Sequence, residues 1–137
     1  MNNSFELAKQ VVDSLSYQDK LNTCYPNTEY TQHENFAYRY VKVTKRIPIA
    51  FIDIYHWSYL HTNDSGFIVY AIRPEFQHQG LSKFLLFKAV EWAKKKNKQF
   101  LVYKALITNE NSLNAALKFG FNLVKTGSKS YTLILKI

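Results

Sequence analysis

Cysteine, glycine and proline are scarce in this sequence of 137 residues, which holds one cysteine, four glycines and three prolines. The single cysteine, Cys24, excludes an internal disulfide and a cysteine-ligated metal cluster, and it indicates a reducing, cytoplasmic compartment. No apolar run approaches the eighteen residues of a membrane-spanning helix. The first six residues also lack the basic start and apolar stretch of a secretory signal. We therefore expect no membrane segment and no export signal.

Acidic residues are also in short supply. Asp and Glu total 10 against 18 Lys and Arg, so the formal net charge is +8. This excess favours an anionic partner, such as nucleic acid, a phosphorylated cofactor or an acidic surface, without choosing among them. The basic residues gather at 94–96 with Lys98, and again at Lys42, Lys45 and Arg46. The simplest interpretation of any one lysine is a solvated side chain at a helix end or turn.

Apolar residues are abundant enough for one hydrophobic core. Hydrophobic residues make up 47% of the chain and aromatic residues 16%, which is typical of a globular protein and not of a disordered one. Because no repeat and no Pro/Gly/Ser-rich linker divides the sequence, we expect one domain over residues 1–137. The four histidines, His33, His56, His61 and His78, show no metal-ligand spacing, so no metal is predicted.

Hydrophobic periodicity predicts alternating helices and strands. A helix is expected over residues 5–15, with Asn3 and Glu6 as a capping box. The polar segment 16–35 fits either a short helix near 17–23 or a long loop. The remaining elements are, in chain order, strands at 36–44, 48–57 and 67–72, a helix at 81–96, a strand at 99–107, a helix at 112–119, and strands at 121–124 and 130–137. This order is that of a single mixed α/β (α+β) domain.

The strand at 48–57 alternates between two apolar faces. One face is expected to hold Ile49, Phe51, Asp53, Tyr55 and Trp57, and the other Ala50, Ile52 and Ile54.

The loop at 77–83, which leads into the helix at 81–96, has the features of an anion site. Free backbone N–H groups and the helix dipole make a helix N-terminus a natural site for a pyrophosphate. Gly80 and the small Ser82 allow a bound group to come close, and Lys83 adds a countercharge. One glycine is a weak signal, so an ordinary loop glycine before a helix is the alternative.

Residues 72–82, Ile-Arg-Pro-Glu-Phe-Gln-His-Gln-Gly-Leu-Ser, resemble the acyl-CoA-binding motif of the GNAT N-acetyltransferase superfamily. The core of that motif is Gln or Arg, two residues, Gly, one residue, then Gly or Ala, and Gln77 and Gly80 match it with Ser82 in the last place. Asn109, Ser112 and Gly120 with Phe121 resemble a second family motif, on the helix that faces the cofactor. The two resemblances together cover roughly residues 66–124.

The resemblance implies a GNAT-like fold, in which a mostly antiparallel, twisted sheet is flanked by about four helices. Acetyl-CoA would be the acyl donor, with its pantetheine arm in a gap between two diverging central strands. The reaction would be direct attack of an amine on the thioester, with amide donation near Ile72 to the carbonyl oxygen. The cofactor-binding residues implied are Tyr70, Ala71, Ile72, Gln77, His78, Gln79, Gly80, Leu81, Ser82, Lys83, Asn109 and Ser112.

The catalytic residues are less well defined by the resemblance. In many family members a tyrosine seven residues after the asparagine acts as the proton donor, but this position is Ala116 here. Ser112 and Tyr103 are the candidate proton donors, against the alternatives of helix capping for Ser112 and core packing for Tyr103. Asp64 is the candidate base, with an ordinary turn residue as its alternative. Lys104 holds a position where relatives often carry the base, and a charged lysine cannot act as one.

Three functions follow from these features. The first is N-acetyl transfer from acetyl-CoA to an unidentified amine on a small molecule, peptide or protein, by a monomer or homodimer. The second is an acyl-CoA-binding regulatory module with weak catalysis, indicated by Ala116 and Lys104. A distant third is nucleic-acid binding through residues 94–98. The absence of a recognition motif of any known nucleic-acid module argues against it. In this superfamily the acceptor is selected by the early helices and their loop, here roughly 16–35, and by the segment after Gly120.

Overall fold

The computed structural model describes residues 3–137 and places them around one six-stranded sheet. The helices are α1 (Ser4–Asp13), α2 (Tyr17–Cys24), α3 (Leu81–Lys95) and α4 (Glu110–Phe119), with a short 3₁₀ turn, η1, at Pro74–Phe76. The strands are β1 (Phe36–Thr44), β2 (Ile47–Trp57), β3 (Ser65–Ile72), β4 (Phe100–Leu106), β5 (Asn122–Thr126) and β6 (Ser130–Lys136). Their order across the sheet is β1-β2-β3-β4-β6-β5. Neighbouring strands are antiparallel except for the parallel pair β3 and β4.

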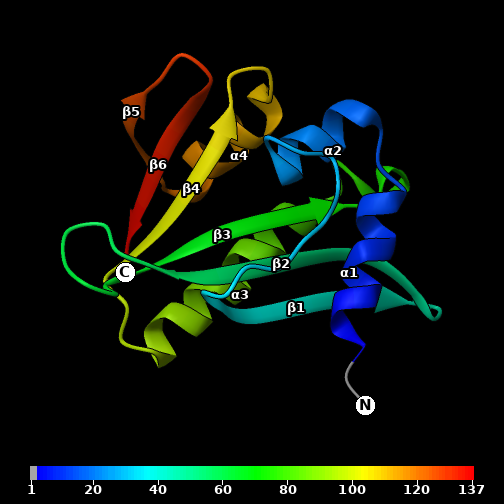
Figure 1. The fold of residues 1–137 in the computed structure, drawn as a ribbon, viewed down its shortest axis with the longest axis horizontal. Helices are drawn as coiled ribbons and strands as arrows, with labels where there is room; N and C mark the ends of the chain where they lie inside the picture. The colour runs from blue at the N-terminus through cyan, green and yellow to red at the C-terminus, as the bar shows by residue number, and fades with distance from the viewer. Residues whose placement is uncertain (1–2) are drawn as a thin grey trace.

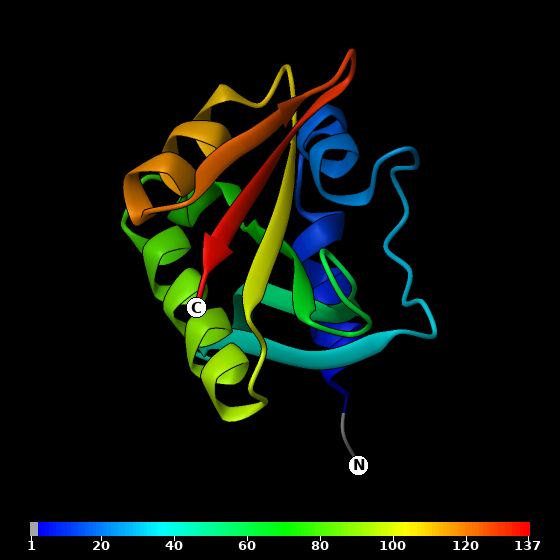
Figure 2. The ribbon, with the colours of Figure 1, turned by 90° about the vertical axis from the view of Figure 1, so that its left-hand side faces the viewer.

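The sheet lies between two unequal layers of helix (Figures 1 and 2). Helices α3 and α4 lie on one side, where α3 packs on β2, β3 and β4, and α4 packs on β4. On the other side α1 packs on β1, β2 and β3, and α2 packs on β3. This second layer therefore covers only one half of the sheet.

Strand β2 divides its side chains between two cores, as its alternation predicts. Ile52 and Ile54 belong to the main core with Trp92 of α3, whereas Phe51 packs in a second core with Val11 of α1. Ile49 differs from the prediction, because it joins the main core and not the face of Phe51. The pairing with β1 skips one residue at this point, so a bulge turns Ile49 to the other side.

Two local predictions at the N-terminus have different outcomes. Segment 17–23 does form the short helix, α2, whose N-cap Ser16 accepts a hydrogen bond from the Asp19 amide at 3.1 Å. The capping box at Asn3 and Glu6 is wrong, since Asn3 precedes α1 but makes no side-chain cap hydrogen bond. Helix α1 is held instead by its apolar face against the sheet.

A buried ion pair fixes the loop between α2 and β1. Arg39 Nε lies 2.8 Å from Asp53 Oδ1, and both side chains are almost fully buried. Tyr30 donates a hydrogen bond to the same carboxylate, and Gln32 accepts one from Arg39 at 2.8 Å. Because unpaired buried charges are costly, these contacts hold the loop on the β1–β2 face.

Candidate functional site

The parallel strands β3 and β4 separate partway along their length (Figure 1). They pair from Ser65 opposite Phe100 as far as Ile68 opposite Tyr103. Beyond this point β3 continues to Ile72 and β4 to Leu106 without pairing. The last turns of both strands therefore flank an opening in the centre of the sheet, which agrees with the gap that the resemblance implies.

The β3 edge of this opening carries free backbone groups. Arg73 N–H donates to the Ile49 carbonyl of β2 at 2.7 Å. Since hydrogen bonds in an antiparallel pair alternate along the strand, Arg73 and Ala71 bond toward β2, whereas the amides of Tyr70 and Ile72 point into the opening. The Ile72 carbonyl also points away from β2 and accepts a hydrogen bond from Gln77 Nε2 at 2.9 Å.

The N-terminus of α3 meets this edge. Gly80 is its N-cap, with a left-handed φ of +85° and no atom within 4 Å of where a side chain would begin. The first backbone bond of the helix runs from Phe84 N–H to the Gly80 carbonyl, so the amides of Leu81, Ser82 and Lys83 have no acceptor within the helix. No acidic side chain lies in the first turn. The turn is thus a site of uncompensated partial positive charge.

One pocket joins these parts. Its lining includes eleven of the predicted site residues: Tyr70, Ala71, Ile72, Gln77, His78, Gly80, Leu81, Ser82, Tyr103, Asn109 and Ser112. Gln79 and Lys83 do not line it, since Gln79 bonds to the Glu75 carbonyl and the Lys83 ammonium lies over the Phe87 ring. The pocket therefore spans the sheet, with α2 on one side of the opening and the N-termini of α3 and α4 on the other.

Three hydroxyl groups meet within the pocket. The rings of Tyr70 and Tyr103 stack with their centroids 5.5 Å apart. Burial raises the pKa of the Tyr103 phenol well above its usual value, and the hydrogen-bonding Ser112 side chain acts in the opposite direction. Burial likewise raises the pKa of Tyr70. Both phenols therefore keep their protons at neutral pH.

Asn109 serves as the N-cap of α4. Its side-chain oxygen accepts a hydrogen bond from the Ser112 amide at 3.4 Å. The capping role considered for Ser112 thus belongs to Asn109, and the Ser112 hydroxyl is left facing the pocket. Ala116, which replaces the usual tyrosine, is buried in the main core.

The structure does not bring Asp64 to this pocket. Asp64 precedes β3, and its carboxylate accepts hydrogen bonds from the amides of Tyr59, Leu60 and His61 at 2.7–2.8 Å. Ser65 Oγ donates a fourth bond at 2.6 Å. Burial alone would raise the pKa of Asp64, but these hydrogen bonds outweigh it and hold the pKa well below its usual range. The carboxylate is placed to order the loop at 58–64.

Helix α2 contributes pocket residues that sequence reasoning missed. Asp19, Asn22 and Thr23 line the pocket from this helix, and Asp19 is the only acidic residue in its lining. Gln18 Nε2 reaches Thr108 Oγ1 at 3.3 Å, which ties α2 to the loop before α4. No local sequence signal marks Asp19, because its relation to the pocket depends on contacts between distant segments.

The predicted basic run is interrupted in the structure. Lys94 and Lys95 lie exposed in the last turn of α3, followed by Lys96. Lys98 is buried and donates to the carbonyl and side-chain oxygens of Asn63 at 3.0 and 2.7 Å. The charge of Lys98 is thus used inside the fold and is not part of the exposed run.

The chain belongs to the Acetyltransferase (GNAT) family, whose sequence pattern it matches over residues 7–121. No curated protein sequence matches it. Among solved structures, it is similar to the GNAT domain of S. lividans PAT, with a TM-score of 0.83, 12% identity, and 96% of this chain and 84% of that chain covered. It is also similar to the ribosomal-protein-S18-alanine N-acetyltransferase from Escherichia coli, with a TM-score of 0.66, 16% identity and coverages of 92% and 87%.

A third similar structure is the PaiA N-acetyltransferase from Thermoplasma acidophilum, solved in complex with coenzyme A. The TM-score is 0.62 at 20% identity, over 69% of this chain and 57% of that chain. The match to the family's sequence pattern confirms the predicted family, and these likenesses, with the element order, confirm the mixed α/β, GNAT-like fold. Within residues 3–137, no helix is long and apolar enough to cross a membrane, and no group of three or more His, Cys, Asp or Glu side chains is arranged to hold a metal.

The lowered pKa of Asp64 predicts that its contribution to the stability of the fold depends on pH. A carboxyl group whose pKa is lower in the folded state stabilises the fold above its unfolded pKa of about 3.9, and this contribution is lost as the pH falls below that value. We expect Asp64→Asn to be less stable than the parent at pH 7 and the difference to shrink toward pH 2.5. Urea unfolding between pH 2.5 and 7 measures this, with the exposed Asp13→Asn as control. A difference that does not depend on pH would contradict the role assigned to the carboxylate.

Proposed function

We propose that this protein transfers an acetyl group from acetyl-CoA to an amine. The single observation that carries the proposal is the pocket where the free β3 edge meets the N-terminus of α3, lined by eleven of the site residues predicted from the sequence. Acetyl-CoA fits what these residues offer, since it combines an anionic pyrophosphate with an amide-rich arm. When bound, it supplies an acetyl thioester that is open to attack by an amine.

The residues of the pocket divide the work of binding. The amides of Leu81, Ser82 and Lys83 would hold the pyrophosphate, where the open space above Gly80 allows close approach. The pantetheine arm would lie along the unpaired β3 edge, with the Tyr70 amide as a donor. The Ile72 amide would donate to the thioester carbonyl oxygen and stabilise the negative charge that develops there.

Tyr103 is our proposed proton donor for the departing thiolate. Its phenol lines the pocket, is protonated at neutral pH and has the Ser112 hydroxyl close by. Ser112 is the second candidate, since the N-cap role is filled by Asn109. These hydroxyls offset the loss of the usual tyrosine at Ala116. Efficient transfer is therefore favoured over the alternative of an acyl-CoA-binding module with weak catalysis.

The amine would enter from the α2 side of the opening. Asp19 is the only acidic group that lines the pocket, so it would attract an acceptor that arrives as an ammonium ion. Asp64 does not line the pocket, and its carboxylate is bound by amides of the loop at 58–64. We therefore propose a structural role for it. The proton that the amine loses would then pass to water or to Asp19.

Three further expectations stay predictions. These are the single domain over residues 1–137, the cytoplasmic location, and the monomeric or homodimeric state. Burial raises the pKa of the half-buried Cys24 thiol to about 11 and keeps it unreactive.

The cofactor site is tested by placing a carboxylate in the first turn of α3. We expect Ser82→Asp to fold as stably as the parent, since an acidic residue suits a helix N-terminus. Acetyl-CoA binding should nevertheless weaken by about tenfold or more, because the carboxylate repels the pyrophosphate. Isothermal titration calorimetry measures the affinity and thermal unfolding the stability. The control, Asn97→Asp, adds the same charge just beyond the other end of α3.

The parent and control should bind acetyl-CoA equally within error. Failure of the parent to bind millimolar acetyl-CoA would reject the proposed function. Equal affinity in Ser82→Asp would show that the pyrophosphate lies elsewhere.

The proton donor is tested by Tyr103→Phe, which removes the hydroxyl and keeps the ring stack with Tyr70. We expect acetyl-CoA affinity to be unchanged and turnover to fall by about 10² or more, the usual size of a general-acid effect. The assay is the release of CoA thiol with the best acceptor from a screen of amines and peptides. Tyr70→Phe is the matched control. Loss of turnover in the control alone would transfer the role to Tyr70.

A further inference from the structure

One face of the β4–β5–β6 half of the sheet is free of helix. Leu101, Tyr103 and Leu133 point into the main core beneath α3 and α4, so the alternate residues point the other way. Strand pairing places these alternate residues together as one surface, which we call the open face: Phe67, Phe100, Val102, Lys104, Lys125, Thr132, Ile134 and Lys136. Helices α1 and α2 pack on β1–β3 and stop short of it (Figure 1).

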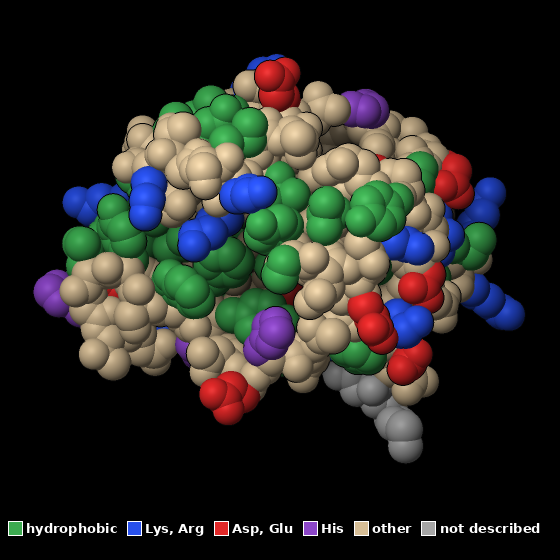
Figure 3. Space-filling view, turned by 45° about the horizontal axis from the view of Figure 1, so that its top comes forward, with side chains coloured by type: hydrophobic (Ala, Val, Ile, Leu, Met, Phe, Trp, Pro, Cys, Tyr) green, Lys and Arg blue, Asp and Glu red, His purple; other side chains and the backbone are tan. Residues whose placement is uncertain are grey.

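The open face has a buried apolar centre and an exposed basic border. Val102 and Ile134 pair across β4 and β6 at its centre, and both are buried under neighbouring side chains. Lys104, Lys125 and Lys136 are exposed around them. Figure 3 shows hydrophobic side chains gathered among Lys and Arg on the left of this side of the molecule, while most Asp and Glu lie toward the right.

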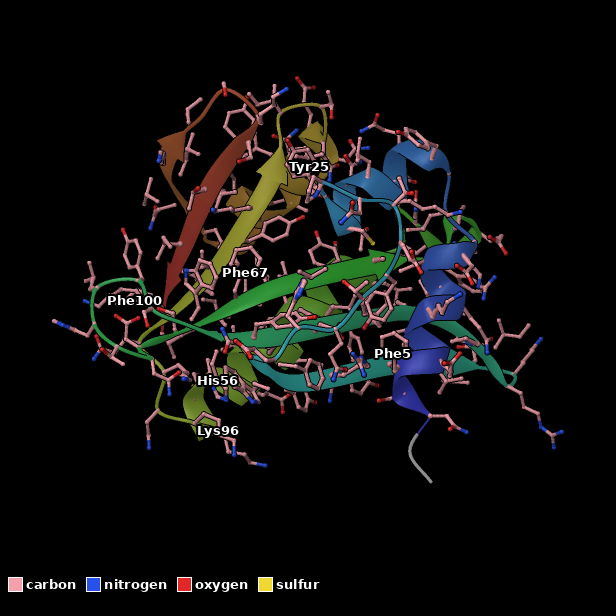
Figure 4. The ribbon with its side chains drawn as sticks, viewed as in Figure 1. Phe5, Tyr25, His56, Phe67, Lys96 and Phe100 are labelled. Atoms are coloured by element: carbon pink, nitrogen blue, oxygen red, sulfur yellow. The ribbon has the colours of Figure 1, made fainter. Side chains whose placement is uncertain are left out.

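Aromatic rings extend the open face toward the loop at 58–64. Trp57 lies with its ring centroid 5.0 Å from that of Phe67, and Tyr59 lies 5.2 Å from Phe100. Trp57 and Tyr59 remain 41% and 39% exposed. In Figure 4, Phe100 marks the end of β4 that is farthest from α2. Large, partly exposed aromatic groups beside charges are typical of surfaces that bind other proteins.

The charge of this region has one sign. Residues 99–137 hold five lysines and a single acidic residue, Glu110, and of these five lysines only Lys118 lies, like Glu110, on α4. Glu110 lies in the first turn of α4, on the opposite side of the sheet. Asp64 comes directly before β3, and its carboxylate is enclosed by hydrogen bonds from its own loop. A partner of the open face therefore meets no accessible carboxylate on these strands.

The open face also adjoins the pocket. Tyr103 lines the pocket and Lys104, the next residue of the same strand, lies on the open face. Asn22 and Thr23 of α2 line the pocket from this side of the sheet, so the opening between β3 and β4 is reached from this face, beside α2. A chain bound along β4 would extend over about 23 Å, the length of some seven extended residues, and one end would lie at the opening.

We propose that the open face binds an acidic segment of a polypeptide that carries the acceptor amine. The proposal rests on the proposed function, and it narrows the acceptor class to a peptide or protein with carboxylates beside the amine. Nucleic acid fits this surface less well, because the planar arginine fork matches phosphate better than lysine does, and the charged residues of the open face are all lysines. The three arginines, Arg39, Arg46 and Arg73, lie on or beside β1, β2 and η1 and not on the open face.

The test compares two double charge reversals. Lys104→Glu with Lys136→Glu changes the open face, while Lys94→Glu with Lys95→Glu makes the same change in net charge at the end of α3. The probes are a dye-labelled heptapeptide, Ala-Glu-Phe-Glu-Leu-Glu-Glu, its counterpart with Gln in place of Glu, and a labelled oligouridylate. Fluorescence anisotropy gives each affinity at 50 and 200 mM salt.

We expect the parent to bind the acidic peptide about tenfold or more tightly than the Gln peptide, and the open-face variant to lose that preference. The α3 variant should retain it. Equal weakening in both variants would overturn the proposal, because it would reflect net charge alone. Tighter binding of oligouridylate than of the acidic peptide, lost in the open-face variant, would also overturn it in favour of nucleic acid.

Acetyl-CoA titrations of the same proteins separate this proposal from the proposed function. Both variants should bind acetyl-CoA as the parent does, since neither change touches the pocket lining. If acetyl-CoA binds and the acidic peptide shows no preference, only the open-face proposal fails. If acetyl-CoA does not bind the parent, the proposed function fails, and a retained peptide preference would then describe a docking surface without transfer.

Discussion

The separation of β3 from β4 beyond Ile68 and Tyr103 is the constraint on which the rest of the site depends. Unpaired backbone groups inside a sheet are costly unless something bonds to them. Here the β3 edge has amides at Tyr70 and Ile72 that face the opening, and Gln77 already satisfies the Ile72 carbonyl. The fold thus creates a strand edge with unmet donors at its centre, where an amide-rich ligand can complete the pairing.

The other parts of the site act around that opening. Gly80, with its left-handed backbone, turns the chain so that the free amides of α3 face the same space. The hydroxyls of Tyr103 and Ser112 enter this space from β4 and α4, on the other side of the break between β3 and β4. Asp19 lies on the opposite side of the sheet. One break in strand pairing therefore separates the end that we propose holds the phosphates from the end that we propose receives the amine.

Features that depend on residues close together in the sequence could be predicted from it. Gly80 and the start of α3 lie within one short segment, so the helix start and its free amides could be predicted. The opening itself followed only from family resemblance, because strand pairing joins distant segments. The hydrogen bonds that enclose Asp64 and bury Lys98 could not be predicted, since their partners in the loop at 58–64 are decided by tertiary structure. Asp19 was missed because α2 reaches the pocket only through contacts such as that with Thr108.

Backbone amide hydrogen exchange, read residue by residue by NMR with and without acetyl-CoA, tests the central claim most directly. The account predicts that the ligand slows exchange at Tyr70 and Ile72 on the strand edge and at 81–83 in the first turn of α3. Amides of Tyr59 and Leu60, bound to Asp64 at the far end of β3, should not change. Protection confined to other surfaces, or none at saturating acetyl-CoA, would contradict the claim that the unpaired edge and the helix N-terminus hold the donor.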